Sequence, residues 1–302
     1  MLLRFLIGPT AVGKTALAID WAKANDAEIL CADAPLVYRG MGIGTAKPTL
    51  AEQRQVKHHG IDLVDVGERF SIADYIAVAK KVVADVAQRG KNILVVGGSG
   101  FYLKSFFEPV TDGVGVSEEI AARAVEIFEA RGLEGLIEEL KKIGGENIEG
   151  LDIKNPRRAI KALERCMASS KGFQEIRRDF LNQPMPFTEF KKRMTMLVRE
   201  KEDLENRIAG RVEQMLDTGL IDEVKKLRAA GLKKNPQAAS VIGYRETLQY
   251  LDGKLTLPEL KALIVQDTLQ LARKQRTFFK QLPIDETVLL APNEKAKVSL
   301  LT

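Results

Sequence analysis

Short apolar runs alternate with amphipathic stretches over the first hundred residues. The apolar runs Leu2–Ile7, 28–32 and 92–96 have the length of buried strands. The stretches Lys14–Ala24 and 72–89, which lie between them, repeat apolar residues at helical spacing. Strands that alternate with helices in this way predict an α/β fold, in which helices flank a parallel sheet.

The pattern changes to helices alone after residue 116. Helical periodicity recurs in the stretches 117–131, 133–142 and 155–169. We therefore predict an inserted all-helical domain over residues 116–199, and we assign residues 1–115 and 200–302 to the core domain with its C-terminal helices. The alternating charges of residues 200–211 predict an exposed helix that joins the two domains.

Composition says more about the cellular compartment of the protein than about its function. With 302 residues, of which 45% are hydrophobic, the chain can bury a full core and one smaller domain. Cys31 and Cys166 lie far apart and lack the spacing of metal ligands, which favours a reduced compartment. The first apolar run is interrupted by Arg4 and is too short for a signal peptide or a membrane span. We expect a cytoplasmic protein that does not associate with membranes.

A phosphate-binding loop follows the first strand directly. Its residues fit the pattern G-x-x-x-x-G-K-[ST] and are Gly8, Pro9, Thr10, Ala11, Val12, Gly13, Lys14 and Thr15. The glycines let backbone N–H groups curl around phosphate oxygens, and Lys14 adds a full positive charge. The hydroxyl of Thr15 is of the kind that coordinates Mg²⁺ on such phosphates. The sequence therefore predicts a site for a diphosphate or triphosphate together with Mg²⁺.

The strand at residues 92–96 ends without the carboxylate that nucleotide hydrolysis requires. P-loop ATPases and GTPases place an acidic residue after a later strand, where it orders Mg²⁺ and water. Here the strand continues into Gly97, Gly98, Ser99 and Gly100. This difference disfavours a P-loop kinase or ATPase.

Polar residues after the second strand are further candidates. Asp33 stands at the carboxyl end of this strand, where open α/β sheets bind ligands. The only two histidines of the chain, His58 and His59, follow a loop at 37–48 that is rich in glycine and polar residues. Taken singly, such an aspartate is as typical of a helix cap, and adjacent histidines are as typical of a structural role.

A basic stripe marks the predicted helix at 155–169. The five side chains have helical spacing and are Lys154, Arg157, Arg158, Lys161 and Arg165. Apolar residues occupy the opposite face at Ile160, Leu163 and Met167. A stripe of this kind is typical either of a solvated surface or of contact with a phosphate backbone.

Together these features resemble the tRNA dimethylallyltransferase family, also called tRNA isopentenyltransferases. The resemblance covers nearly the whole chain. It rests on ordered motifs at 8–15, 33, 37–40, 43–48, 58–59, 97–103, 162–164, 211–216, 219–224 and 242–245. It implies a P-loop NTPase-like core and the transfer of a dimethylallyl group from dimethylallyl diphosphate to N6 of adenosine 37 in tRNA, with release of pyrophosphate.

The resemblance also implies roles for individual residues. Asp33 would accept the proton of the adenine amine, and Ser99, where the family has threonine, would assist the departing oxygen. The implied tRNA contacts are Asp33, Ala34, Pro35, Leu36, Arg157, Arg158, Ala159, Ile160, Lys161, Val241, Ile242, Gly243, Tyr244, Arg245 and Glu246. The implied partners are the anticodon loop of tRNA and dimethylallyl diphosphate, with Mg²⁺ as cofactor, and we expect a monomer.

Three of the positions that depart from the family pattern bear on base recognition or on burial. Ala34 and Leu36 replace a serine and a glutamine of the usual Asp-Ser-x-Gln segment, so recognition of the target base is affected more than leaving-group chemistry. Leu269 replaces an arginine on a helix face that carries Arg273 and Arg276, where we expect leucine to gain nothing from burial.

Two alternatives to the tRNA-modifying transferase stay open. The first is a transferase that uses a free adenine nucleotide as acceptor, which the basic stripe argues against. The second is a non-catalytic RNA-binding relative, for which Ala34 and Leu36 are the motive.

Overall fold

A computed structural model describes residues 2–292 and 294 of the chain. It divides into two compact units, a core unit of Met1–Ser105 with Phe187–Thr302 and an insertion unit of Phe106–Pro186. The predicted core segment 200–302 extends over residues 293 and 295–302, which lie outside the described residues.

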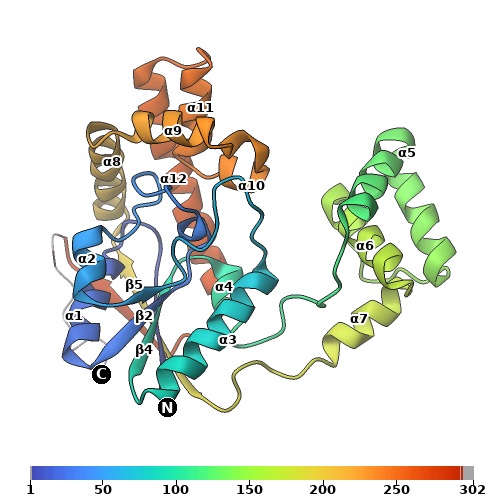
Figure 1. Cartoon of the computed structure of the whole chain (residues 1–302), viewed down its shortest axis with the longest axis horizontal. Helices are drawn as coiled ribbons and strands as arrows, with labels where there is room; N and C mark the ends of the chain where they lie inside the picture. Colours follow the sequence, from blue (N-terminus) through green and yellow to red (C-terminus); the bar gives the residue numbers. More distant parts are fainter. Residues whose placement is uncertain (1, 293, 295–302) are drawn as a thin grey trace. The chain divides into compact units, whose positions relative to one another are not determined.

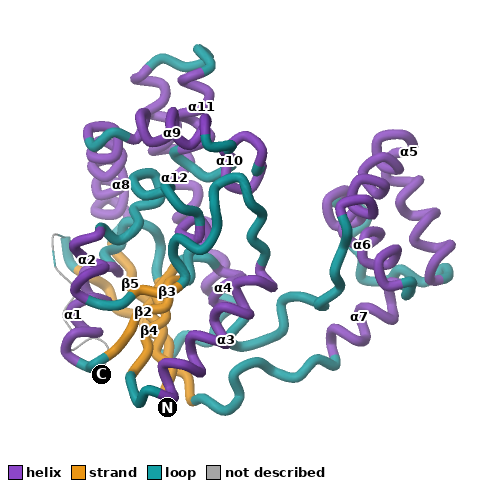
Figure 2. Tube along the Cα trace, viewed as in Figure 1, coloured by secondary structure: helices purple, strands orange, loops and turns teal. Residues whose placement is uncertain are grey.

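A parallel sheet forms the centre of the core unit, and Figure 2 shows its strands side by side. In the part of the chain that the structure describes, this sheet has six strands in the order β3-β2-β4-β1-β5-β6, and each neighbouring pair is parallel. The strands are β1 (Leu2–Ile7), β2 (Ala27–Cys31), β3 (His58–His59), β4 (Asn92–Gly97), β5 (Lys191–Arg199) and β6 (Glu286–Leu290). The predicted α/β class is confirmed.

Apolar faces of the sheet are buried under helices on both sides. Helix α1 (Lys14–Ala24) packs its residues Leu17 and Trp21 into a cluster with strand residues such as Leu94 and Leu197. Helix α3 (Ile72–Gln88) contacts β2 and β4, with Tyr75 and Val83 buried. Figure 1 shows four helices gathered at one end of the core unit, which are α8 (Lys201–Asp217), α9 (Leu220–Ala229), α11 (Tyr244–Leu251) and α12 (Leu257–Phe279). Side chains from α8 reach the loop after β1, so this end is the carboxyl edge of the sheet.

The helices agree with the predictions where their periodicity was clear. Helix α1 has the predicted bounds, and α3 ends one residue before the predicted end. The helices of the core unit are α1 (Lys14–Ala24), α2 (Leu50–Gln55), α3 (Ile72–Gln88), α4 (Gly100–Lys104), α8 (Lys201–Asp217), α9 (Leu220–Ala229), α10 (Pro236–Ala239), α11 (Tyr244–Leu251) and α12 (Leu257–Phe279). Short 3₁₀ helices occupy Ala34–Val37 and Leu232–Lys234.

The insertion unit is helical within its described residues. It consists of α5 (Glu118–Gly144), α6 (Pro156–Ser169) and α7 (Phe173–Leu181). Gly132 has a non-helical backbone with φ of 62°, so α5 is two helices at the predicted break. The core of this unit joins Leu136, Leu163 and Cys166, as the apolar face of α6 predicts.

The predicted limits of the insertion domain, 116 and 199, are wrong at both ends. The insertion unit spans residues 106–186, because β5 pairs with β1 and β6 inside the sheet. This strand begins with Lys191, Lys192 and Arg193, whose charges conceal the strand pattern. Strand β3 was missed because it has only two residues.

Candidate active site

The loop between β1 and α1 has the backbone of a phosphate cradle. Gly8, Ala11 and Gly13 have positive φ values of 153°, 63° and 108°. A Cβ at Gly8 would lie 2.6 Å from the carbonyl oxygen of Leu197, so only glycine fits there. Helix α1 begins at Lys14, and its first N–H groups have no carbonyl of their own helix to bind. These donors and the helix dipole make an anion site at the end of β1.

The Lys14 ammonium group bends back over this loop. Its Nζ donates to the carbonyl oxygens of Gly8 and Pro9 at 2.8 and 3.1 Å. Desolvation lowers the pKa of Lys14 to about 8, and the nearby carboxylate of Asp33 opposes this shift. A bound anion would restore the solvation that the ammonium group lacks.

Three arginines that come after the insertion bind the same loop. Arg199 at the end of β5 donates Nε to the Val12 carbonyl at 2.9 Å. From α8, Arg207 donates Nε to the Ala11 carbonyl at 2.8 Å, and Arg211 reaches Oγ1 of Thr10 at 3.3 Å. Desolvation and the charge of a neighbouring arginine lower the pKa values of Arg207 and Arg211. Such crowding of cations favours an anionic ligand.

Reciprocal hydrogen bonds join the segment of Asp33, which follows β2, to the segment of Ser99, which follows β4. Oδ1 of Asp33 accepts from the N–H of Gly98 at 2.6 Å. In return, Oγ of Ser99 accepts from the N–H of Ala34 at 2.8 Å. The close approach needs Gly97, because a Cβ there would lie 2.2 Å from the Ala32 carbonyl oxygen. Both predicted catalytic side chains therefore meet at the carboxyl edge of the sheet.

The environment of Asp33 suits a proton acceptor. Burial raises the pKa of Asp33, whereas the positive charge of Lys14 and the N–H of Gly98 lower it. A carboxylate with a raised pKa is a stronger base toward the proton of an acceptor group.

Gln275 of α12 connects the phosphate loop to the turn that holds Asp33. Its Oε1 accepts from the N–H of Thr10 at 2.9 Å, and its Nε2 donates to the Gly98 carbonyl at 3.1 Å. A Cβ at Gly98 would lie 2.4 Å from this nitrogen, so glycine makes room for the bridge. The two loops are thus held at a fixed separation.

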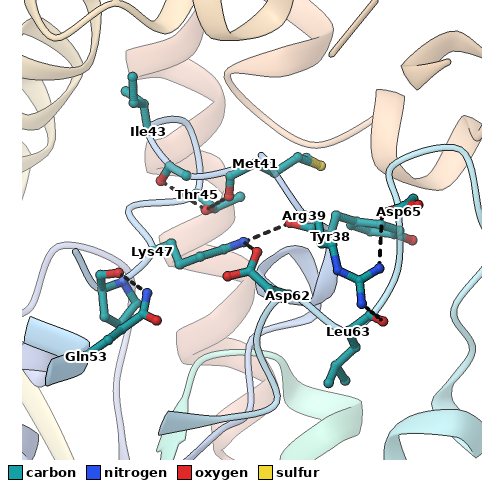
Figure 3. A network of polar contacts seen from close by, with 12 residues as sticks. Tyr38, Arg39, Met41, Ile43, Thr45, Lys47, Gln53, Asp62, Leu63 and Asp65 are labelled. Atoms are coloured by element: carbon teal, nitrogen blue, oxygen red, sulfur yellow. Dashed lines mark hydrogen bonds and ion pairs between the residues drawn. The ribbon is translucent and has the colours of Figure 1, made fainter. Parts of the chain in front are cut away.

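One pocket of about 930 Å³ in the core unit is lined by Lys14, Asp33, Ser99, Arg207, Arg211 and Gln275, among other residues. The phosphate side is formed by residues 10–16 with Arg207 and Arg211. The lining also includes part of a loop of residues 41–48, which we call the wall loop and which presents Gly44, Thr45, Ala46 and Pro48 to the pocket. Figure 3 shows part of the polar network that fixes this loop.

Comparison with known proteins gives the family. The model of the family described as IPP transferase matches residues 36–282. The chain belongs to the IPP transferase family. A tRNA dimethylallyltransferase of Opitutus terrae is 48% identical over 292 residues, which cover 95% of this chain and 94% of that protein.

Solved structures agree with this membership in the IPP transferase family. The crystal structure of a tRNA isopentenylpyrophosphate transferase from Bacillus halodurans is 32% identical, has a TM-score of 0.67 and is matched over 96% of this chain and 89% of its own. A eukaryotic dimethylallyltransferase acting on tRNA has the same fold at a TM-score of 0.79 and 24% identity, with 97% of this chain and 74% of that chain covered.

The tRNA-contacting residues that the IPP transferase resemblance implies divide into three groups in the structure. Asp33, Ala34, Pro35 and Leu36 line the pocket, as do Val241, Ile242 and Arg245. The side chains of Tyr244 and Glu246 are wholly buried, and Glu246 accepts from the N–H of Gly243 at 2.6 Å. These two side chains support the turn from inside the protein, and their contact with tRNA stays a prediction.

The third group lies on α6 of the insertion unit. Ala159 is wholly buried in the core of that unit, and the partly buried Ile160 packs against the same core. The Ala159 side chain therefore does not reach the surface of α6. Arg157, Arg158 and Lys161 are exposed, as predicted. Carboxylates partly neutralise the stripe through the pairs Arg158–Asp152, Lys161–Glu164 and Arg165–Asp112 at 3.1, 2.7 and 3.0 Å.

Of the three residues that depart from the family pattern, Leu36 and Leu269 pack among apolar side chains, and nothing in the structure explains the alanine at position 34. Leu36 belongs to the apolar cluster around α1 and also lines the pocket. Ala34 contributes its backbone N–H to Ser99. The expectation that Leu269 gains nothing from burial is wrong, because Leu269 packs against Ala11, Leu204 and Ile208.

The sequence reading missed the arginines of α8. The predicted exposed helix at 200–211 instead turns Arg207 and Arg211 into the pocket and buries Leu204 and Ile208. The signal was present, because these apolar residues and these arginines each repeat at a spacing of four.

Two further properties concern metals and membranes. Among the described residues, no group of three or more histidine, cysteine, aspartate or glutamate side chains is arranged to hold a metal ion. Within residues 2–292 and 294, no helix has the length and apolar character needed to cross a membrane.

Proposed function

We propose that this protein transfers the dimethylallyl group of dimethylallyl diphosphate to N6 of adenosine 37 in the anticodon loop of tRNA. The supporting observation is that one pocket contains a phosphate loop crowded with cations and, beside it, the linked pair Asp33 and Ser99. A diphosphate is then held as a leaving group, and no strand-end carboxylate is needed to activate water. The names of the relatives point to the same reaction.

The reaction forms a bond from N6 to the allylic carbon and breaks the bond from that carbon to the diphosphate oxygen. The diphosphate leaves with the electron pair, and Lys14, Arg207 and Arg211 stabilise its charge. Asp33 accepts the proton that N6 loses. Because Ser99 Oγ accepts from Ala34, its own hydrogen remains to be donated to the departing oxygen.

Mg²⁺ is part of this proposal. The Thr15 hydroxyl lies in the pocket beside the phosphate loop, which fits an ion held by one protein hydroxyl and by phosphate oxygens. When bound, the ion would neutralise part of the charge on the leaving diphosphate.

The target adenosine must leave the stacked anticodon loop to reach this pocket, because the reacting groups lie inside it. The exposed cations Arg157, Arg158 and Lys161 are suited to the RNA backbone. We also propose that the protein acts as a monomer.

Mass spectrometry of an anticodon stem-loop RNA after incubation with the protein, Mg²⁺ and dimethylallyl diphosphate tests the proposal. The expected result is a five-carbon mass gain on RNA with adenosine at position 37 and none on RNA with guanosine there. AMP serves as a parallel acceptor. A gain on AMP alone would assign the protein to nucleotide modification, and no gain on either acceptor would contradict the proposed transfer.

A further inference from the structure

The wall loop at residues 41–48 is held by its own polar contacts. Thr45 Oγ1 donates to the Met41 carbonyl at 2.7 Å. Lys47 Nζ donates to the Tyr38 carbonyl at 2.8 Å and pairs with Asp62 at 2.5 Å, and only 6% of the Lys47 side chain is exposed (Figure 3). The one cation of the loop is therefore neutralised and turned away from solvent.

A carboxylate from a distant helix binds the start of this loop. Oε2 of Glu223, on α9, accepts from the N–H groups of Gly42 and Ile43 at 3.1 and 2.8 Å. Its Oε1 accepts from the N–H of Gly44 at 3.3 Å. Successive N–H groups that converge in this way form a nest, a geometry that elsewhere binds phosphate. Here a side chain of the protein itself fills the nest.

Glu223 also connects the wall loop to the turn before α11. Tyr244 donates its hydroxyl to Oε1 of Glu223 at 2.6 Å, and its ring is wholly buried. A Cβ at Gly44 would lie 2.5 Å from this ring, so the loop rests directly on Tyr244. The neighbours of Tyr244, which are Ile242 and Arg245, line the pocket. One carboxylate therefore aligns two segments of the pocket lining.

The chemistry of the wall loop suits a neutral group. Its converging N–H donors are occupied by Glu223, and Lys47 is paired, so neither can bind a phosphate. The phosphate loop has the opposite character, since cations crowd it. Of the two substrates in the proposed reaction, the acceptor base is the one that must be held near Asp33 without a phosphate contact.

We infer that Glu223 is a positioning residue for the acceptor, which shapes the wall loop and the Tyr244 turn so that the RNA base is held against Asp33. This inference rests on the proposed function. Glu223 touches no reacting atom and acts through the backbone of residues 42–44.

The variant Glu223→Gln tests this role. Its amide offers one acceptor oxygen and places an NH₂ group against backbone donors, so the loop loses its anchor while side-chain volume is kept. We expect the KM for the stem-loop RNA to rise on the order of tenfold, as the loss of charge-assisted hydrogen bonds predicts. We expect kcat at saturating RNA and the Kd for pyrophosphate to stay within about twofold of the unaltered protein.

Asp222→Asn is the matched control. Asp222 is the preceding residue of the same helix, is 72% exposed and pairs only with Lys225 among the contacts described. Asp222→Asn removes the same charge from α9 as Glu223→Gln does, but it leaves the hydrogen bonds of the wall loop in place. Tyr244→Phe keeps the ring that supports Gly44 and removes only the hydroxyl, and we expect a smaller rise in KM for RNA than in Glu223→Gln.

Fluorescence anisotropy with labelled RNA gives an affinity that does not depend on turnover. If the unaltered protein transfers nothing to RNA, the proposed function fails, and RNA affinity then decides the role of Glu223 separately. Equal RNA affinity in Glu223→Gln and Asp222→Asn would overturn the inference. So would a loss confined to pyrophosphate binding, or a fall in kcat with an unchanged KM for RNA.

Discussion

The phosphate loop and the wall loop face the same pocket but are held by opposite charges. Arginines bind carbonyl oxygens of the phosphate loop, at Val12 and Ala11. A glutamate binds N–H groups of the wall loop, at Gly42 and Ile43. In both cases the side chains that bind the loop come from the part of the chain that follows the insertion unit.

The difference indicates which substrate each loop contacts. When carbonyls are held by cations, the N–H groups at the start of α1 remain available for a diphosphate. When N–H groups are held by a carboxylate, the loop offers nothing to a phosphate and suits a base. Under the proposed function, the phosphate loop binds the donor and the wall loop faces the acceptor, while Asp33 lines the same pocket.

The largest effect is expected at Asp33, where the two substrates meet. In Asp33→Asn the side chain still offers an oxygen to the N–H of Gly98 but can no longer accept a proton. We expect kcat to fall about a thousandfold, within the range of general base catalysis, while the affinities for pyrophosphate and RNA are kept. Single-turnover transfer and calorimetric titration with pyrophosphate measure the two quantities. A variant that keeps most of its transfer rate would assign the base to another residue.

On the phosphate side, Arg207→Met removes a cation that both holds the Ala11 carbonyl and lines the pocket. We expect the Kd for pyrophosphate with Mg²⁺ to rise about a hundredfold, because a desolvated charge and its hydrogen bond are lost. RNA affinity should be unchanged. Lys201→Met is the control, since Lys201 begins the same helix and is 78% exposed. Similar losses in both variants would mean that only net charge matters.

The pH dependence of donor use should follow Lys14. Its lowered pKa of about 8 means that the ammonium form, which attracts the diphosphate, predominates below pH 8 and is lost as the pH rises above that value. We therefore expect kcat/KM for dimethylallyl diphosphate to fall about tenfold per pH unit above pH 8. Affinity for RNA should lack this limb. If kcat/KM of Lys14→Met fell in the same way above pH 8, the pH dependence would belong to another group.

On the acceptor side, Gly44→Ala places a methyl group where a Cβ lies 2.5 Å from the Tyr244 ring. The wall loop must shift, and we expect a rise of about fivefold in the KM for RNA with an unchanged Kd for pyrophosphate. Gly210→Ala is the control, because a Cβ at Gly210 meets no atom within 4 Å. Equal KM values in the two variants would show that the wall loop does not contact the acceptor.

The sequence was most informative where a local motif carries the chemistry. The phosphate loop was predicted residue by residue, because its spacing alone specifies its shape. Asp33 was a candidate because it stands at the carboxyl end of a strand, where open α/β sheets bind ligands. Its catalytic role and that of Ser99 were implied only by the family resemblance. The fold class followed from the alternation of strands and helices.

Contacts across large sequence distances were beyond such reasoning. Glu223 meets a loop that lies about 180 positions earlier, and no periodicity links the two segments. The α8 arginines look like surface charges until β5 is placed inside the sheet. Leu269 looked misplaced on a basic face because its apolar partners come from α8 and from Ala11.

The most direct test compares Arg207→Met and Glu223→Gln in one experiment, with the Kd for pyrophosphate and the KM for RNA measured in both. We predict that Arg207→Met raises only the Kd for pyrophosphate and that Glu223→Gln raises only the KM for RNA. If both variants raised the Kd for pyrophosphate, or both raised the KM for RNA, the two loops would not serve different substrates, and this central claim would be wrong.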